Sequence, residues 1–321
     1  MKVIAIVGPT GVGKSRVALA LASELGAEVV SADSRQVYRY MDIGTAKPNA
    51  QDRALVPHHL IDVVNPDEPF SLALYQEMAS RALEDIDRRG KVALLVGGTG
   101  LYVRAVLEGW RVPRVAPDPE LRRRLEERAQ AESGALYNEL AKLDPVAAEG
   151  IDPRNLRRII RALEVCYTTG VPFSALKGTT PPPFQALVVG LTSTREVLYQ
   201  GIDSRVDDMV RQGLVDEVRR LVEQGYGLDL PSMSGIGYRE IGMYLRGQLD
   251  LPTAVERIKF ETHRFARHQY GWFRTSDKRI HWLNITGEVE QAGRQKIGCF
   301  LGQEPRLHST PGCLTQALEA R

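Results

Sequence analysis

The fold is decided near the N-terminus, where Lys2-Val3-Ile4-Ala5-Ile6-Val7 leads into Gly8-Pro9-Thr10-Gly11-Val12-Gly13-Lys14-Ser15. The first run is short, apolar and β-branched, as in a buried parallel strand. The second run fits the pattern G-x-x-x-x-G-K-[ST] in full. A helical pattern from Lys14 to Leu25 follows, and Gly26 ends it. This order predicts a phosphate-binding loop (P-loop) at the edge of an α/β sheet.

Each part of this loop suits the binding of a phosphate. The glycines let backbone N–H groups curve around phosphate oxygens, and the following helix directs its positive end at the same anion. Lys14 adds a point charge, and the Ser15 hydroxyl suits Mg²⁺. The sequence therefore predicts a site for a phosphorylated small molecule and Mg²⁺, with Ser15 as the metal ligand. Its predicted residues are Gly8, Pro9, Thr10, Gly11, Val12, Gly13, Lys14 and Ser15.

Further strands and helices alternate along the chain. The patterns predict strands at 28–32, 91–96, 186–191 and 280–284, and helices at 72–89, 194–224, 237–247 and 252–274. This alternation is typical of a P-loop NTPase-like α/β fold, a parallel sheet with helices on both faces. Clusters of proline near 113–119 and 172–183 enclose a charged, helical segment. We therefore expect a helical insertion domain at 113–183 within a catalytic core of 1–112 and 184–321.

Composition sets limits on the class of protein. The chain has 321 residues, 43% of them hydrophobic, and a net charge of only +2, which says little about partners. Cys166, Cys299 and Cys313 are far apart and form no C-x-x-C pair, which argues against a zinc site or a disulfide framework. No apolar run approaches the roughly 20 residues of a membrane span. We expect a cytoplasmic protein without membrane contact.

The kind of phosphate chemistry is less clear from the residues alone. A kinase or NTPase usually has a strand that ends in an Asp for Mg²⁺. The strand 92–96 ends instead in Gly97-Gly98-Thr99, and Asp62 is a weak substitute. Asp33 follows the second strand, at the edge where α/β sheets bind ligands. It could act as a base, hold Mg²⁺ through water or be an ordinary turn residue.

Several stretches resemble the tRNA dimethylallyltransferases (tRNA isopentenyltransferases), in the bacterial type that lacks a zinc finger. The resemblance covers about residues 3–284. Besides Gly8 to Ser15, it rests on Ser31-Ala32-Asp33-Ser34-Arg35-Gln36-Val37-Tyr38, Met41-Asp42-Ile43-Gly44-Thr45-Ala46-Lys47-Pro48, His58-His59-Leu60-Ile61-Asp62, Leu95-Val96-Gly97-Gly98-Thr99-Gly100-Leu101-Tyr102, Arg161-Ala162-Leu163-Glu164-Val165, Gly237-Tyr238-Arg239 and Trp272-Phe273-Arg274.

The resemblance implies transfer of a dimethylallyl group from dimethylallyl diphosphate to N6 of the adenosine on the 3′ side of the anticodon in tRNA. The P-loop would then hold the diphosphate leaving group, with Mg²⁺ and without ATP. By the family pattern Asp33 is the general base, Thr99 lies near the reacting centre, and Arg205 binds the diphosphate.

The resemblance also implies a tRNA surface and a monomer. The residues carried over are Asp33, Ser34, Arg35, Gln36, Thr99, Arg122, Arg157, Arg158, Ile159, Ile160, Arg161, Gly237, Tyr238 and Arg239. Arg154, Arg157, Arg158 and Arg161 would share one helix face, which alone is more typical of a solvated surface. In the 252–274 helix we expect Ile258, Thr262, Phe265 and Trp272 to be core.

Three positions depart from the family pattern. Gly201 stands where many members have Arg, and His263 and His268 stand at typical Arg positions. Three other functions stay open at this point: a small-molecule P-loop kinase, an adenylate prenyltransferase that uses free AMP, ADP or ATP, and a non-catalytic RNA-binding module.

Overall fold

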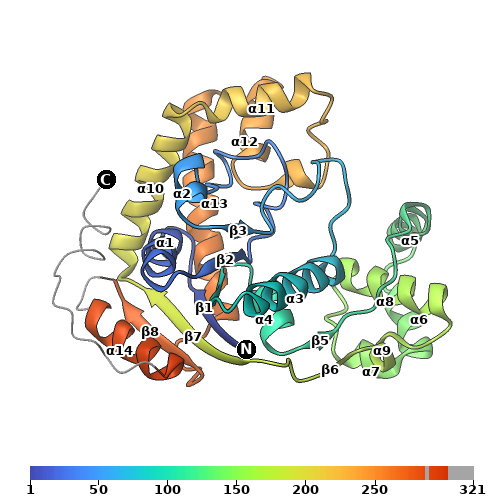
Figure 1. Ribbon diagram of the computed structural model, residues 1–321. Helices are drawn as coiled ribbons and strands as arrows, with labels where there is room; N and C mark the ends of the chain where they lie inside the picture. Colours follow the sequence, from blue (N-terminus) through green and yellow to red (C-terminus); the bar gives the residue numbers. More distant parts are fainter. Residues whose placement is uncertain (286–288, 303–321) are drawn as a thin grey trace. The chain divides into compact units, whose positions relative to one another are not determined.

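The computed structural model describes residues 1–285 and 289–302 (Figure 1). The chain divides into two compact units, one made of Met1–Leu107 and Pro183–Arg321, the other of Glu108–Pro182. The second unit thus begins at Glu108, slightly before the proline cluster at which the sequence placed the junction.

A six-stranded sheet forms the centre of the first unit (Figure 1). Its strand order is β3 (His58–His59), β2 (Glu28–Ser31), β4 (Ala93–Val96), β1 (Lys2–Val7), β7 (Gln185–Thr192) and β8 (Ile280–Asn284). All neighbouring strands pair in parallel. The predicted α/β fold with a parallel sheet is therefore confirmed. The two-residue strand β3 was not predicted, because it is too short to give a periodic pattern.

Helices cover both faces of this sheet, and alternate residues of β1 face them. Ile4 and Ile6 belong to one core cluster, most of whose helical residues come from α1 (Lys14–Leu25), α10 (Arg195–Arg211), α11 (Leu214–Glu223), α12 (Tyr238–Leu245) and α13 (Leu251–Trp272), with one residue each from η1 (Ser232–Ser234) and α14 (Val289–Leu301). Val3 and Ala5 belong to the other cluster, with α3 (Leu72–Arg88) and α4 (Gly100–Leu107). The unit also contains helix α2 (Ala50–Leu55).

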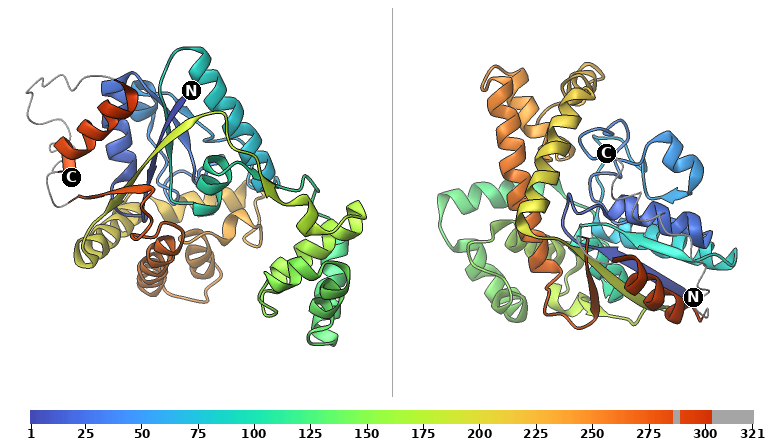
Figure 2. Two further views of the ribbon diagram at one scale, coloured as in Figure 1. Left: turned by 90° about the horizontal axis from the view of Figure 1, so that it is seen from below. Right: turned by 90° about the vertical axis from the view of Figure 1, so that its left-hand side faces the viewer.

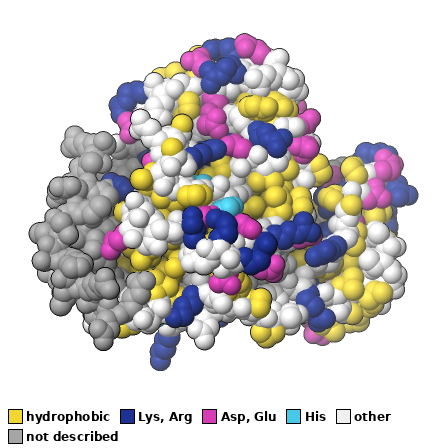
Figure 3. Space-filling model, viewed as in Figure 1, with side chains coloured by type: hydrophobic (Ala, Val, Ile, Leu, Met, Phe, Trp, Pro, Cys, Tyr) yellow, Lys and Arg dark blue, Asp and Glu magenta, His cyan; other side chains and the backbone are white. Residues whose placement is uncertain are grey.

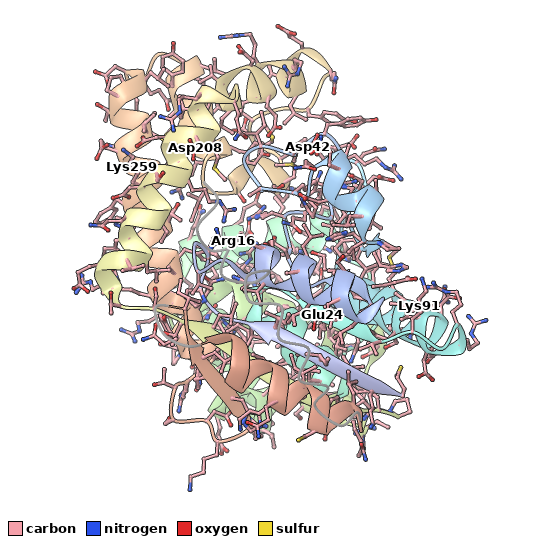
Figure 4. The ribbon with its side chains drawn as sticks, turned by 60° about the vertical axis from the view of Figure 1, so that its left-hand side comes forward. Arg16, Glu24, Asp42, Lys91, Asp208 and Lys259 are labelled. Atoms are coloured by element: carbon pink, nitrogen blue, oxygen red, sulfur yellow. The ribbon has the colours of Figure 1, made fainter. Side chains whose placement is uncertain are left out.

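Helices α10 and α13 run side by side (Figure 2). The Lys259 ammonium of α13, labelled in Figure 4, lies 2.9 Å from a carboxylate oxygen of Asp207 in α10. His263 also stacks on Tyr199 of α10, with ring centroids 3.9 Å apart. His263, one of the three departures from the family pattern, is therefore part of the contact between these helices.

Two sequence expectations for this region were wrong. The single helix expected over 194–224 is two helices, because Gly213 between them has a φ of 100°, which ends α10. Phe265 was expected in the core but is 43% exposed. The buried residues of α13 are Ala254, Ile258, Ala266 and Gln269. Its buried stripe thus passes through Ala266 and leaves Phe265 outside.

The second unit is helical and has its own apolar core. Its helices are α5 (Pro119–Ala131), α6 (Ala135–Leu143), α7 (Pro145–Glu149), α8 (Leu156–Thr169) and α9 (Phe173–Leu176). Leu125, Leu140, Ile159 and Leu163 are among the buried residues that form this core. A short antiparallel pair, β5 (Trp110–Arg111) and β6 (Gly178–Thr179), joins the two ends of the unit. The unit therefore has the core of an independently packed helical domain.

Candidate active site

Three neighbouring strands end at the same edge of the sheet and bring the predicted site residues together. Strand β2 leads into Asp33, and its neighbour β4 leads into Gly97-Gly98-Thr99. Strand β1, next to β4, leads into the loop that joins it to α1. Ligands bind at this edge of a parallel sheet. The Thr99 segment therefore lies between the Asp33 segment and the β1–α1 loop (residues 8–13).

The β1–α1 loop has the conformation expected of an anion cradle. Gly13 has a φ of 88° and directly precedes α1, so the loop turns sharply into the helix N-terminus. That conformation strains any residue with a Cβ, which explains the glycine. The first N–H groups of a helix lack partners within it and favour an anion. This geometry suits a diphosphate.

Two cations accompany the loop. Lys14 Nζ donates a hydrogen bond of 2.7 Å to the Pro9 carbonyl oxygen. Burial is the main cause that lowers the pKa of Lys14 to about 7; Asp33 opposes this shift and Arg205 adds to it. Burial also lowers the pKa of Arg205, again opposed by Asp33. Lys14, Arg205 and Asp33 thus lie close enough to influence one another, as the sequence predicted for one site.

Hydrogen bonds fix the segments that carry Asp33 and Thr99. Oδ1 of Asp33 accepts a 2.8 Å hydrogen bond from the backbone N–H of Arg35, and Oγ1 of Thr99 accepts one of 3.0 Å from that of Ser34. A Cβ on Gly97 would lie 2.2 Å from the carbonyl oxygen of Ala32. Only glycine permits this approach of the two segments. Asp33 and Thr99 are therefore held in a fixed relation.

An aromatic pair lies beside the carboxylate. The rings of Tyr75 and Tyr102 stack with centroids 3.9 Å apart. Burial is the main cause that raises the pKa of each phenol, and Asp33 contributes to both shifts. Both tyrosines are therefore neutral at ordinary pH. Both rings are buried in the core, and sequence reasoning did not single out the pair.

In the first unit, some side chains predicted to bind tRNA form hydrogen bonds to the protein backbone. The Arg35 guanidinium donates hydrogen bonds of 3.0 and 3.1 Å to the carbonyl oxygens of Pro231 and Ser232. The amide nitrogen of Gln36 donates to the carbonyl oxygens of Thr45 and Ala46 at 3.3 and 3.2 Å. Both side chains shape the loops around Asp33. Gln36 is buried, whereas Asp33, Ser34 and Arg35 are partly exposed.

The segment of Gly237, Tyr238 and Arg239 is also largely structural. The Tyr238 hydroxyl donates a 2.6 Å hydrogen bond to Glu217, and the Tyr238 ring is buried. Arg239 is exposed and pairs with Glu240 at 2.5 Å. Gly237 has a φ of 95° and precedes α12. Of the three residues, only Arg239 offers an exposed side chain for a contact with RNA.

A buried carboxylate, that of Glu217, organises the loop before α2. It accepts backbone N–H groups from Asp42, Ile43 and Gly44 at 3.0, 2.7 and 3.1 Å. Asp42 is labelled on this loop in Figure 4. Glu217 lies on the same face of α11 as the buried Leu214, a polar residue in an apolar stripe. That pattern is the signal that could have identified it from the sequence.

In the second unit the predicted RNA-binding arginines have two different environments. Arg122 and Arg161 hold the buried Glu164, at 2.8 and 2.6 Å. Arg157 and Arg158 are exposed and form no ion pair within the described part of the chain. Arg154 precedes α8 and pairs with Asp152 at 2.9 Å, so it is not on the helix face where the sequence placed it.

The two isoleucines predicted with these arginines are buried. Ile159 and Ile160 are 2% and 4% exposed and belong to the core of the second unit. The two isoleucines lie on the buried face of this amphipathic helix, and the exposed arginines next to them lie on its other face. This burial leaves their side chains no surface with which to contact RNA.

Acidic and basic side chains alternate on the face shown in Figure 3. On α5, Arg123 pairs with Glu120 and Glu127 at 2.7 and 2.6 Å. The sequence had left only Arg122 of this arginine run as a contact for RNA, and Arg122 is engaged with Glu164. Exposed basic residues without a pairing partner are therefore more informative than the total charge.

The side chains available as metal ligands indicate what kind of Mg²⁺ site the protein could form. Ser15 is the second residue of α1 and is exposed. No group of three or more His, Cys, Asp or Glu residues within 1–285 and 289–302 could hold a metal. Mg²⁺ commonly uses one or two protein ligands together with substrate phosphates and waters. The residues therefore fit a metal held mainly by the substrate. The alternative ligand, Asp62, instead pairs with Lys47 and Arg53, both at 2.6 Å.

The parallel sheet, the β1–α1 loop and the neighbouring carboxylate define an α/β protein that binds a phosphorylated ligand at the edge of its sheet. A family model described as IPP transferase matches residues 36–276, and one described as Isopentenyl transferase matches residues 1–55. The chain belongs to the IPP transferase family.

Curated relatives match most of the chain. The tRNA dimethylallyltransferase of Roseiflexus castenholzii is 58% identical over 272 residues, 84% of this chain and 89% of that protein. The tRNA dimethylallyltransferase of Thermomicrobium roseum is 53% identical over 305 residues, 94% of this chain and 92% of that protein.

Solved structures agree with the fold. The full-length tRNA isopentenylpyrophosphate transferase of Bacillus halodurans has a TM-score of 0.68 and 39% identity, over 99% of this chain and 98% of that one. A eukaryotic dimethylallyltransferase acting on tRNA has a TM-score of 0.80 and 29% identity, over 99% of this chain and 84% of that one. Within the described residues, every helix is too short or too polar to span a membrane.

Proposed function

We propose that this enzyme transfers the dimethylallyl group of dimethylallyl diphosphate to N6 of the adenosine 3′ to the anticodon in tRNA. The observation that carries the proposal is the edge of the sheet at which Asp33 lies near Lys14 and Arg205. A base for the amine and two cations for a diphosphate are thus available at one place. Two relatives named tRNA dimethylallyltransferase, 58% and 53% identical to this chain, support the same reaction.

The chemical step needs a proton acceptor and a charge acceptor. As the bond forms between N6 and the allylic carbon, the bond between that carbon and the diphosphate oxygen breaks. The N6 proton passes to the Asp33 carboxylate, and the electron pair of the broken bond leaves with the diphosphate. Lys14, Arg205 and the N–H groups at the start of α1 offset the charge that the leaving group gains. The low pKa of free Lys14 rises once this anion is bound beside it.

Mg²⁺ would be held by the Ser15 hydroxyl and the diphosphate, and it would neutralise part of the leaving group's charge. Thr99 lies between the two halves of the site, where it holds Ser34 and hence the segment of Asp33. The adenosine must leave the anticodon-loop stack to reach a carboxylate at this depth.

In the second unit, the exposed Arg157 and Arg158 would contact the tRNA backbone. We also propose that the enzyme acts in the cytoplasm as a monomer, since its relatives modify tRNA and the site needs only the described residues of one chain.

One incubation tests the acceptor. The enzyme is given labelled dimethylallyl diphosphate, Mg²⁺, and either an unmodified tRNA transcript, the same transcript with guanosine in place of the target adenosine, or AMP. Label is expected only in the first transcript. Label in AMP would instead indicate an adenylate prenyltransferase, and turnover of ATP with a small acceptor would indicate a kinase.

A further inference from the structure

The amide of Gln269 joins the β1–α1 loop to the Thr99 segment. Its Oε1 accepts a hydrogen bond of 2.7 Å from the backbone N–H of Thr10, and its Nε2 donates one of 2.9 Å to the carbonyl oxygen of Gly98. We propose that Gln269 is a positioning residue that sets the distance between the diphosphate cradle and the base that receives the proton. The inference rests on the proposed transferase function.

The Gln269 amide is buried and lies close to the backbone that it contacts. Gln269 is only 4% exposed, so water cannot replace the two hydrogen bonds. A Cβ on Gly98 would lie 2.2 Å from Nε2 of Gln269, so only glycine lets the amide reach the backbone there. Both bonds are made to backbone groups, which cannot turn away as a side chain could. The amide therefore fixes two stretches of main chain.

The helix that carries Gln269 is itself anchored at this point. The adjacent Tyr270 shares a hydrogen bond of 2.9 Å with the Thr192 hydroxyl at the end of β7. Two residues further on, the carbonyl oxygen of Trp272 accepts one of 3.0 Å from Arg104 of α4. The end of α13 is thus attached to the sheet on one side and to α4 on the other. Gln269 is presented from a rigid support, as positioning requires.

The bonds of Gln269 continue into the catalytic segments. Gly98 precedes Thr99, whose Oγ1 accepts the N–H of Ser34, next to Asp33. Hydrogen bonds therefore connect Thr10 to Gln269 and Gln269 to Gly98, and the next residue, Thr99, is hydrogen-bonded to the segment of the base. Displacement of reacting groups by about 1 Å can cost about 100-fold in rate. Loss of Gln269 should therefore impair the chemical step more than the binding of diphosphate.

Only a neutral amide meets both requirements at this position. The Thr10 N–H needs an acceptor and the Gly98 carbonyl needs a donor, and an amide supplies one of each. A carboxylate of the same shape would keep the acceptor but place an oxygen against the Gly98 carbonyl. Its protonated form would donate again. Gln269→Glu is therefore a matched variant whose defect depends on pH.

The test compares Gln269→Met, Gln269→Glu and, as a control, the exposed Gln248→Met with the unchanged enzyme. The measurements are kcat for tRNA prenylation at saturating substrates, the Kd for inorganic diphosphate, and the thermal midpoint. We expect Gln269→Met to lower kcat by about 10- to 100-fold while the diphosphate Kd changes by less than about threefold. We expect kcat of Gln269→Glu, relative to the unchanged enzyme, to recover as pH falls from 8 to 6. Gln248→Met should leave all three values unchanged.

A purely structural residue would lower the thermal midpoint without changing kcat per folded enzyme. A kcat within about twofold of the unchanged enzyme for both Gln269 variants would overturn the inference, as would a loss of diphosphate affinity equal to the loss in kcat. A second check is the combination with Thr99→Val. If Gln269 acts through the Thr99 segment, the two losses in kcat are less than multiplicative; multiplicative losses would contradict it. An inactive unchanged enzyme would overturn the proposed function itself, and the inference with it.

Discussion

Oγ1 of Thr99 accepts a hydrogen bond of 3.0 Å from the backbone N–H of Ser34, which ties the end of β4 to the end of β2. This bond fixes the segment in which Asp33 lies, since Ser34 is the next residue. The Asp33 carboxylate is also held from its own segment, because it accepts the N–H of Arg35 at 2.8 Å. Oδ1 of Asp33 thus orients the carboxylate. The other oxygen takes no part in that bond and can receive a proton.

Asp33→Asn tests this arrangement. The amide keeps the shape and one acceptor oxygen but cannot take up a proton. A positioned base contributes about 10²- to 10⁴-fold, so we expect kcat to fall by about that factor. KM for dimethylallyl diphosphate should change little, and KM for tRNA should rise modestly. The exposed Asp67→Asn serves as the matched control and should behave as the unchanged enzyme.

A Mg²⁺ titration of the Asn variant separates a base from a metal ligand. If Asp33 organised the metal, high Mg²⁺ would restore much of kcat and diphosphate binding would suffer. We expect no such rescue. Near-normal kcat at every Mg²⁺ concentration would rule out both assignments.

The pKa of Lys14 predicts how diphosphate binding depends on pH. Because the pKa of Lys14 in the free enzyme is about 7, its ammonium is present before binding only below that pH. Above pH 7 a proton must be taken up with the anion. Affinity should then fall by up to about tenfold per pH unit, until the higher pKa of the bound state is reached. Calorimetry in buffers of different ionisation enthalpy should detect uptake of about 0.9 proton at pH 8.

Lys14→Ala is the control for the diphosphate's own ionisation. The variant should bind more weakly at pH 6, and the ratio of the two affinities should shrink as pH rises to 8. A constant ratio from pH 6 to pH 8 would show that the charge of Lys14 does not titrate in this range.

The local motifs predicted most of the site, whereas contacts between distant segments were not predictable. Asp33, Thr99 and the β1–α1 loop follow strands whose short apolar patterns identify them. Gln269 and Thr10 lie 259 positions apart, and no local pattern relates them. Periodicity identifies the buried face of α13, but it does not say which backbone that face meets. A polar residue within an otherwise apolar, buried helix face can indicate such a contact with distant backbone. Gln269 and Glu217 are both residues of this kind.

Glu217→Ala tests the buried carboxylate beneath the loop before α2. The change leaves the N–H groups of Asp42, Ile43 and Gly44 without their acceptor. An unsatisfied buried polar group costs about 1–3 kcal/mol, so we expect a loss of at least about 3 kcal/mol in unfolding free energy. For a unit of this size that corresponds to a fall of about 10 °C in Tm. Asp216→Ala, which removes an exposed pair with Arg219, should change Tm little. Equal effects of the two changes would contradict this role for Glu217.

The arginines of the second unit fall into two groups that the sequence could not distinguish. Arg161 and Arg122 hold the carboxylate of Glu164, which is buried. Burial raises the pKa of Glu164, but the bonds from Arg122, from the Asp118 N–H and from Arg161 outweigh it and leave the pKa below its usual value. Removing one partner should therefore destabilise the second unit, by about 2 kcal/mol while the other arginine remains.

Arg157 and Arg158 are exposed and have no such partner among the residues that the structure describes, so their loss should cost less than about 0.5 kcal/mol of stability. We expect Arg157→Glu with Arg158→Glu to raise KM for tRNA, to leave kcat and diphosphate binding unchanged, and to reduce the slope of log affinity against log salt by about 2. Arg161→Gln should instead increase proteolysis of the second unit, with a smaller change in the salt slope. Limited proteolysis and tRNA binding between 50 and 200 mM salt measure both effects. An unaltered salt slope in the Arg157 and Arg158 variant would mean that these side chains form only a solvated helix face.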